Sequence, residues 1–146
     1  MSPNRTSAEL GALYQEMILD HYRRPRNKGT LENPDASVEM KNPLCGDEIE
    51  LQVAFDGNNV CDLKFSGRGC SISQASASMM TQLVKGKSKD EIETIRKQFR
   101  DLMMGDPSAA EDAQLGSLRS LSGVARFPAR VKCALLAWNA LESALS

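Results

Sequence analysis

The hydrophobic positions in the first part of the chain recur at helical spacing. Thr6 and Glu9 form a capping box, and the apolar pattern that follows continues until Pro25. Its members lie three or four residues apart: Leu10, Leu13, Tyr14, Met17, Ile18, His21 and Tyr22. The spacing predicts a first helix, followed by a connecting loop over 23–36. Because His21 falls on the apolar stripe, we expect a packed, structural histidine there.

The period of the pattern changes to two between residues 38 and 66. Apolar side chains alternate in three short runs: Val38 and Met40; Ile49, Leu51, Val53 and Phe55; Cys61, Leu63 and Phe65. Turn sequences over 42–47 and 56–59 separate the runs. Three consecutive strands with tight turns predict an antiparallel meander. Since Cys61 is in phase with Leu63 and Phe65, its side chain is predicted to be buried in the core as a small hydrophobe.

Helical spacing returns after residue 70. Ser71 and Ser88 each begin a capping box, and Pro128 opens a last helix that is predicted to be mostly buried. A weak short helix is expected within 108–123. No repeat or linker divides the chain, so residues 1–146 are predicted to form a single α+β domain. Its three-stranded antiparallel meander would carry about five helices, packed mainly on one face of the sheet.

Composition and charge narrow the class of protein. The 146 residues are 41% apolar and 25% charged, which is typical of a globular domain of ordinary size. A formal net charge of −1 argues against nucleic acid or an anionic membrane surface as the partner. The longest apolar run, residues 133–138, is too short to span a bilayer, and the N-terminal pattern is not that of a signal peptide. We therefore expect a cytoplasmic protein.

That compartment changes how the four cysteines are interpreted. A reducing environment favours free thiols, metal ligands or a reactive thiolate over disulfides. Cys45 lies in the turn between the first two predicted strands, Cys70 follows Gly-Arg-Gly at the start of a helix, and Cys133 lies early in the last helix. These are positions from which a scaffold presents functional groups. His21 is the only histidine, which disfavours a hydrolase built on a histidine base.

Asp47 follows Cys45 by two residues and offers a fourth donor. Three thiolates and one carboxylate can fill the tetrahedral shell of a zinc ion. The resulting net charge of about −2 favours nearby cations, and Arg130 and Lys132 flank Cys133. Successive cysteines of this set are separated by 24 and 62 residues, with no Cys-x-x-Cys knuckle. The pattern alone therefore leaves a metal site and three unrelated thiols as alternatives.

Four motifs add more than the spacing does. They occur in the order DHYRRPRN at 20–27, NPLCGD at 42–47, GRGCSIS at 67–73 and FPARVKCA at 127–134. Together they resemble the U-type iron–sulfur cluster assembly proteins, the IscU and NifU N-terminal family, over essentially the whole chain. Scaffolds of the IscU type have a histidine directly before the third cysteine and a shorter connection to it. Lys132 and the long connection over 86–118 are instead similar to the SufU branch of zinc-dependent sulfurtransferases.

The resemblance implies a zinc site formed by Cys45, Asp47, Cys70 and Cys133. It also implies that Cys45 accepts sulfur from the persulfide of a pyridoxal-phosphate-dependent cysteine desulfurase of the SufS type and passes it to downstream Suf scaffold proteins. Arg130 is a candidate for stabilising the freed Cys45 thiolate, on the basis of charge and proximity in sequence. One alternative is a scaffold on which a [2Fe–2S] cluster forms at the same cysteines. Another is a structural zinc domain that binds a partner.

Overall fold

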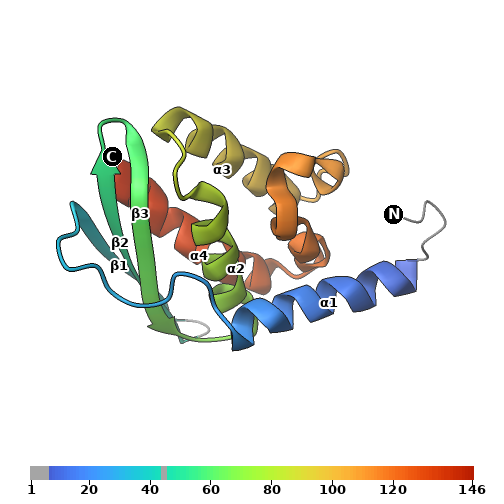
Figure 1. Cartoon of the computed structure of the whole chain (residues 1–146). Coiled ribbons are helices and arrows are strands. Elements are labelled where there is room, and N and C mark those ends of the chain that lie inside the picture. Colours follow the sequence, from blue (N-terminus) through green and yellow to red (C-terminus); the bar gives the residue numbers. More distant parts are fainter. Residues whose placement is uncertain (1–6, 44–45) are drawn as a thin grey trace.

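The computed structural model describes residues 7–43 and 46–146 and shows an α+β arrangement (Figure 1). The elements follow in the order α1 (Ser7–Arg23), β1 (Ala36–Asn42), β2 (Asp47–Asp56), β3 (Asn59–Arg68), α2 (Ser71–Val84), α3 (Lys89–Met103), the 3-10 segments η1 (Ala109–Glu111) and η2 (Ala113–Arg126), and α4 (Pro128–Leu145). The predicted first helix is confirmed. Its expected capping residue, Thr6, lies outside the described residues.

The three strands form one antiparallel sheet in the order β1-β2-β3, as predicted. The register places Leu51 opposite Val38 on one side and Phe65 on the other. Side chains at alternate positions of β2 and β3 are fully buried: Ile49, Leu51, Val53, Leu63 and Phe65. Helices α2 and α4 pack against this face of the sheet (Figure 1). The core therefore lies between the meander and the helices on one of its faces.

The predicted burial of Cys61 is wrong because β3 contains a β-bulge. Ala54 pairs with Asp62 and Phe55 pairs with Val60, so Cys61 is the extra residue on its strand. Val60 occupies the buried position and Cys61 is exposed, with its Sγ donating to the Ala54 carbonyl oxygen at 3.4 Å. One inserted residue turns the side chains beyond it to the opposite face of the sheet. The alternation of residue types along the sequence does not reveal such a bulge.

The helix boundaries differ from the sequence pattern at two places. Cys70, rather than Ser71, is the N-cap of α2, and no side chain caps that helix. The capping box of α3 forms as predicted, with Ser88 Oγ accepting from the Glu91 N–H at 3.2 Å. The weak short helix expected within 108–123 takes the form of the 3-10 segments η1 and η2, which extend to Arg126; η2 bends at Gly116, whose φ is 52°.

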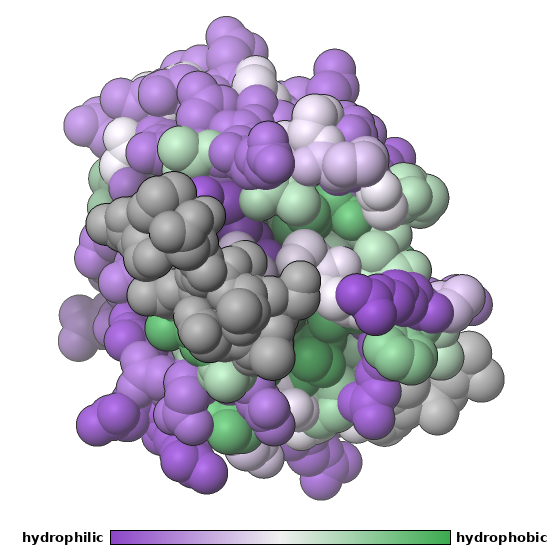
Figure 2. Space-filling model, turned by 90° about the vertical axis from the view of Figure 1, so that its right-hand side faces the viewer, coloured by the Kyte–Doolittle hydropathy of each residue, from purple (hydrophilic) through white to green (hydrophobic). Residues whose placement is uncertain are grey.

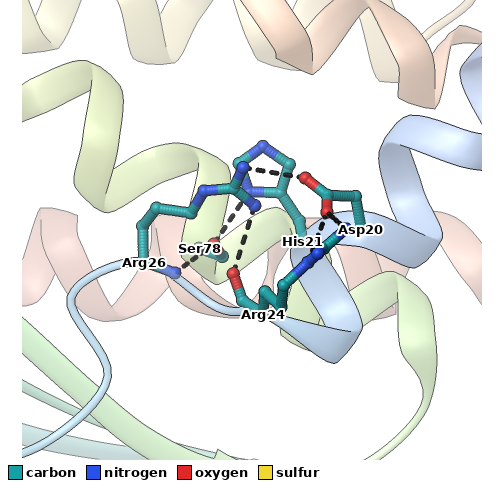
Figure 3. A network of polar contacts seen from close by, with 5 residues as sticks. All are labelled: Asp20, His21, Arg24, Arg26 and Ser78. Atoms are coloured by element: carbon teal, nitrogen blue, oxygen red, sulfur yellow. Dashed lines mark hydrogen bonds and ion pairs between the residues drawn. The ribbon is translucent and has the colours of Figure 1, made fainter.

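A polar network fastens the end of α1 to α2 (Figure 3). His21 is only 5% exposed, and its Nδ1 lies 2.8 Å from Ser78 Oγ. The same hydroxyl accepts from the Arg26 main-chain N–H at 2.8 Å. Asp20 forms ion pairs with Arg24 at 2.7 Å and Arg26 at 2.8 Å. His21 is thus a packed, structural histidine, as predicted.

The network has a consequence for protonation. Burial lowers the pKa of His21, the nearby Arg26 cation lowers it further, and Asp20 opposes both effects. Hydrogen bonds from Arg26 and Arg24 lower the pKa of Asp20, so that carboxylate stays charged throughout the range in which histidine titrates.

We expect the free energy of unfolding to decrease as the pH falls below about 6.5, because the unfolded chain then takes up a proton that folded His21 resists. Each unit by which the folded pKa is depressed corresponds to about 1.4 kcal/mol. Urea unfolding at several pH values between about 5.5 and 7.5 measures the loss. His21→Gln should show a smaller loss than wild type over this range. Equal pH dependence in the two proteins would contradict the role assigned to His21.

Candidate metal centre

Three of the four predicted donors converge at one end of the sheet. One ligand atom from each of Asp47, Cys70 and Cys133 lies within 4.8 Å of the other two. The residues come from the first position of β2, the N-cap of α2 and the second turn of α4. Asp47 and Cys133 are fully buried, and Cys70 is half-buried. The fourth predicted donor, Cys45, lies outside the described residues.

Two glycines allow β3 to pass close to the start of β2. Gly67 and Gly69 have φ values of 152° and 149°, which side chains of L-residues rarely accept. A Cβ atom at residue 69 would lie 2.3 Å from Asp47 Oδ1, and one at residue 67 would lie 2.1 Å from the Glu48 carbonyl oxygen. This close approach lets the Cys70 main-chain N–H donate to Asp47 Oδ1 at 2.8 Å. The Gly-Arg-Gly sequence therefore places Cys70 beside the carboxylate.

Asn42 contributes a polar contact that the sequence analysis missed. It is the last residue of β1, it pairs across the ladder with Asp47, and it is buried. Its Nδ2 donates to Cys133 Sγ at 3.8 Å, across 91 residues of sequence. The sequence did indicate that the Asn42 side chain points inward, because Asn42 continues the alternation of Val38 and Met40 along the strand. A polar side chain at such a position needs a partner inside.

The chemistry of the donor set fits a zinc ion. Thiolates favour zinc over the harder ions calcium and magnesium, and a single carboxylate is compatible with a tetrahedral shell. Ligand sulfurs about 2.3 Å from one zinc ion lie roughly 3.8 Å apart, so donors within 4.8 Å of one another need little movement to share it. Asp47, Cys70 and Cys133 would hold such an ion and leave one position for a further donor.

Buried neutral dipoles contribute to the electrostatics of the described donors. Lys132 and Arg130 are both exposed at the start of α4. Two hydrogen bonds to the donors come from neutral groups: the Cys70 main-chain N–H donates to Asp47 Oδ1, and the Asn42 amide donates to Cys133 Sγ. Buried dipoles next to the ligands can therefore stabilise negative charge at the centre.

Comparisons with known proteins identify the class. Residues 13–146 match the family model described as the NifU-like N terminal domain. The chain is 49% identical over 140 residues to the zinc-dependent sulfurtransferase SufU of Bacillus subtilis, covering 96% of this chain and 94% of the relative. It is 44% identical over 138 residues to the iron–sulfur cluster assembly scaffold protein IscU of Streptococcus pyogenes, covering 94% and 86%.

Solved structures show the same architecture. A putative iron–sulfur cluster assembly scaffold protein for the SUF system from Fervidobacterium islandicum superposes with a TM-score of 0.83 at 37% identity, covering 97% of this chain and all of that one. A NifU-like protein from Brucella abortus gives a TM-score of 0.81 over 90% and 91% of the two chains, and at 23% identity it shows the fold alone.

The fold and the cysteine site thus define an iron–sulfur cluster assembly protein. More specifically, the chain belongs to the NifU-like N-terminal domain family, and its relatives include SufU-type and IscU-type proteins. Within the described residues, no helix has both the length and the hydropathy needed to cross a membrane.

Gly69→Ala is expected to cost more free energy of unfolding than Gly86→Ala. Both glycines have positive φ values, 149° and 86°, so both alanines introduce backbone strain. Only the Cβ at residue 69 collides with Asp47, whereas the one at residue 86 meets nothing within 4 Å. We expect an additional loss of about 1–3 kcal/mol at residue 69 in urea unfolding. Equal losses for the two variants would contradict the close approach.

Asn42→Ala should weaken zinc binding about tenfold or more, because it removes an N–H donor to a ligand sulfur. Asn42→Asp should weaken binding further, since it adds a negative charge beside Cys133. Competition with a chromogenic chelator measures the affinity, and circular dichroism checks the fold. Asn139→Ala, an exposed change on the same helix as Cys133, is the control. Unchanged affinity in both Asn42 variants would exclude the contact as a contributor.

Proposed function

We propose that this protein is a zinc-dependent sulfur acceptor and sulfurtransferase in iron–sulfur cluster biogenesis. The convergence of Asp47, Cys70 and Cys133 within 4.8 Å carries the proposal. The 49% identical relative named a zinc-dependent sulfurtransferase supports it. The presence of Lys132, instead of a histidine, before the third cysteine also favours this activity over a cluster scaffold.

Cys45 is the proposed sulfur acceptor and the fourth zinc ligand. The paired residues Asn42 and Asp47 close the β1–β2 ladder, and Cys45 belongs to the four residues between them. Since two residues of chain span at most about 7 Å, Cys45 is tethered close to Asp47. A cysteine on a hairpin loop can approach a partner while its neighbours stay fixed in the scaffold.

The proposed reaction is thiol–persulfide exchange. Zinc, when bound, would hold its cysteine ligands as thiolates at neutral pH. The Cys45 thiolate attacks the outer sulfur of a persulfide carried by the donor's cysteine. A sulfur–sulfur bond forms at Cys45 as the donor's sulfur–sulfur bond breaks, and the donor cysteine leaves as a thiolate, so the exchange needs no outside oxidant or reductant.

Other residues keep the centre in place while Cys45 reacts. Asp47 and Cys133 are buried, and the Cys70 main-chain N–H bonds to the Asp47 carboxylate, so these three donors belong to the rigid part of the fold. Arg130 is exposed at the start of α4 and forms no ion pair with a described residue. Its guanidinium is the proposed stabiliser of the freed Cys45 thiolate.

The proposed partners follow from this chemistry. A pyridoxal-phosphate-dependent cysteine desulfurase of the SufS type would supply the persulfide, and a downstream Suf scaffold would receive the sulfur. The cytoplasm is the proposed compartment, because a reducing environment keeps the acceptor thiol available.

A scaffold that assembles a [2Fe–2S] cluster is the second candidate. The 44% identical relative named an IscU scaffold favours it. A protonated lysine amine has no lone pair to give a metal, which makes the exposed Lys132 a poor fourth ligand. Reconstitution with iron and sulfide, followed by transfer of an intact cluster to an apo-protein, would support the scaffold over the sulfurtransferase.

Cys45→Ala is expected to abolish stimulation of the desulfurase and leave the domain folded. In wild type, incubation with a SufS-type desulfurase and cysteine should place one additional sulfur atom on the peptide containing Cys45, as read by intact-mass measurement and peptide mapping. Cys61→Ala is the matched control, because Cys61 is an exposed cysteine on the bulge of β3 and should not affect the transfer.

Two results would count against the proposal. Stimulation by Cys45→Ala at the wild-type level would remove Cys45 from the reaction. Identical behaviour of Cys45→Ala and Cys70→Ala, with melting of the fold on zinc chelation, would instead indicate a structural zinc domain.

A further inference from the structure

A groove of about 800 Å3 runs beside the candidate metal centre. It lies between α1 and η2 and reaches the first residues of α2 and α4; residues that line it include Tyr14, Ile18, Ile72, Val124, Arg126 and Arg130. Figure 2 views this side of the molecule and shows hydrophobic residues gathered around a hollow. The volume is of the size that accepts a few side chains of another molecule.

The charge of the groove is unlike that of the whole chain. The protein has a formal net charge of −1, yet the described lining contains two arginines and no Asp or Glu. Arg24 and Arg26 pair with Asp20, and Arg96 pairs with Glu142. Neither Arg126 nor Arg130 pairs with any acidic residue that the structure describes. Two guanidinium groups are thus available to carboxylates from outside.

An exposed aromatic ring stands at the same edge. Phe127, which separates η2 from α4, is 60% exposed and lines the groove. An exposed aromatic side chain next to arginines above an apolar floor is the composition that dominates binding energy in protein interfaces. Small anions would use the arginines alone. A peptide segment with both apolar and acidic side chains would use the floor, the ring and the arginines together.

The position of the groove indicates which protein supplies that segment. Ser71 and Ile72 directly follow Cys70, and Arg130 precedes Cys133 by one turn of α4. A segment lying in the groove therefore sits against the same helix ends that carry two of the thiols. Under the proposed function, the sulfur donor must bring its persulfide to this centre. The donor is therefore the protein expected to supply the segment that lies in the groove.

We propose that the groove is the docking site for a segment of the cysteine desulfurase that presents an apolar side chain next to Asp or Glu. The identity of the partner in this proposal is taken from the proposed function. The apolar side chain packs on Ile18, Ile72 and Val124, and the carboxylate pairs with Arg126 at the rim.

Arg126→Glu tests the docking site, because Arg126 is exposed at the end of η2 and is not among the donors of the centre. Binding of the purified zinc-loaded variant to a SufS-type desulfurase is measured by titration calorimetry at about 0.05 M and about 0.3 M salt. We expect about tenfold or greater weakening at low salt, with a smaller salt dependence than wild type. Phe127→Ala should weaken binding at both salt concentrations. Zinc content and urea unfolding check that each variant is intact.

Arg100→Glu provides the matched control, because it reverses an exposed arginine on α3 outside the groove lining. It should bind the desulfurase like wild type. Wild-type affinity in both Arg126→Glu and Phe127→Ala, or equal weakening by Arg100→Glu, would overturn the docking site. Weaker self-association of these variants in sedimentation, with unchanged desulfurase binding, would assign the groove to a second copy and also overturn it.

The docking site and the proposed function can fail separately. If wild type acquires sulfur on Cys45 but Arg126→Glu and Phe127→Ala both bind normally, only the docking site is wrong. If Arg126→Glu weakens binding but no sulfur reaches Cys45 in wild type, only the transfer role is wrong. Absence of any binding by wild type would remove the docking site.

Discussion

The hydrogen bond from the Cys70 main-chain N–H to Asp47 Oδ1 is the contact on which the centre depends. It joins the first residue of β2 to the residue that begins α2, and both are needed to present donors at one point. The contact forms because two glycines let β3 approach the start of β2 more closely than a side chain would permit. The ends of the sheet and of the helix are thereby held in one arrangement before any ion binds. Such preorganisation keeps the thiol at the start of α2 close to the carboxylate at all times.

The burial of the described donors explains how the site can anchor an ion while a separate residue, the proposed acceptor Cys45, reacts. Asp47 and Cys133 have no exposed surface, whereas Cys70 is half-buried. The firm donors are attached to a strand and a helix within the core, and the proposed acceptor belongs to the connection between two strands. Sulfur transfer requires this division of roles, because the attacking sulfur must reach the partner's persulfide while the other donors stay in place. A centre with all its donors in the core would bind metal well, but none of its sulfurs could reach the persulfide of a partner.

Sequence patterning predicted the elements better than it predicted the site. The alternation from Ile49 to Phe55 predicted the central strand because its buried face is continuous. The pattern failed at Cys61, where a bulge changes the facing without changing residue types. The weak short helix predicted within 108–123 corresponds to the 3-10 segments η1 and η2, and the pattern did not show their full extent or the bend at Gly116.

The candidate site could not be derived from spacing. Asp47, Cys70 and Cys133 are brought together only by tertiary packing, so their proximity was expected from motif resemblance and not from local pattern. For Asn42 the strand pattern indicated an inward-facing side chain, but its partner could not be predicted because it lies 91 residues away. The groove between α1 and η2 was beyond prediction as well, because it forms only where these two segments and the first residues of α2 and α4 pack together.

The pairing of Asn42 with Asp47 also limits how this hairpin can diverge. Both residues are committed to the centre, one through its amide and the other through its carboxylate, and four residues connect them. Inserting or deleting one residue within the ladder would slide one strand past the other and turn alternate side chains to the opposite face. Length variation among proteins with this centre should therefore accumulate in segments such as 104–112, which lies between α3 and η2 and contributes none of the donor atoms.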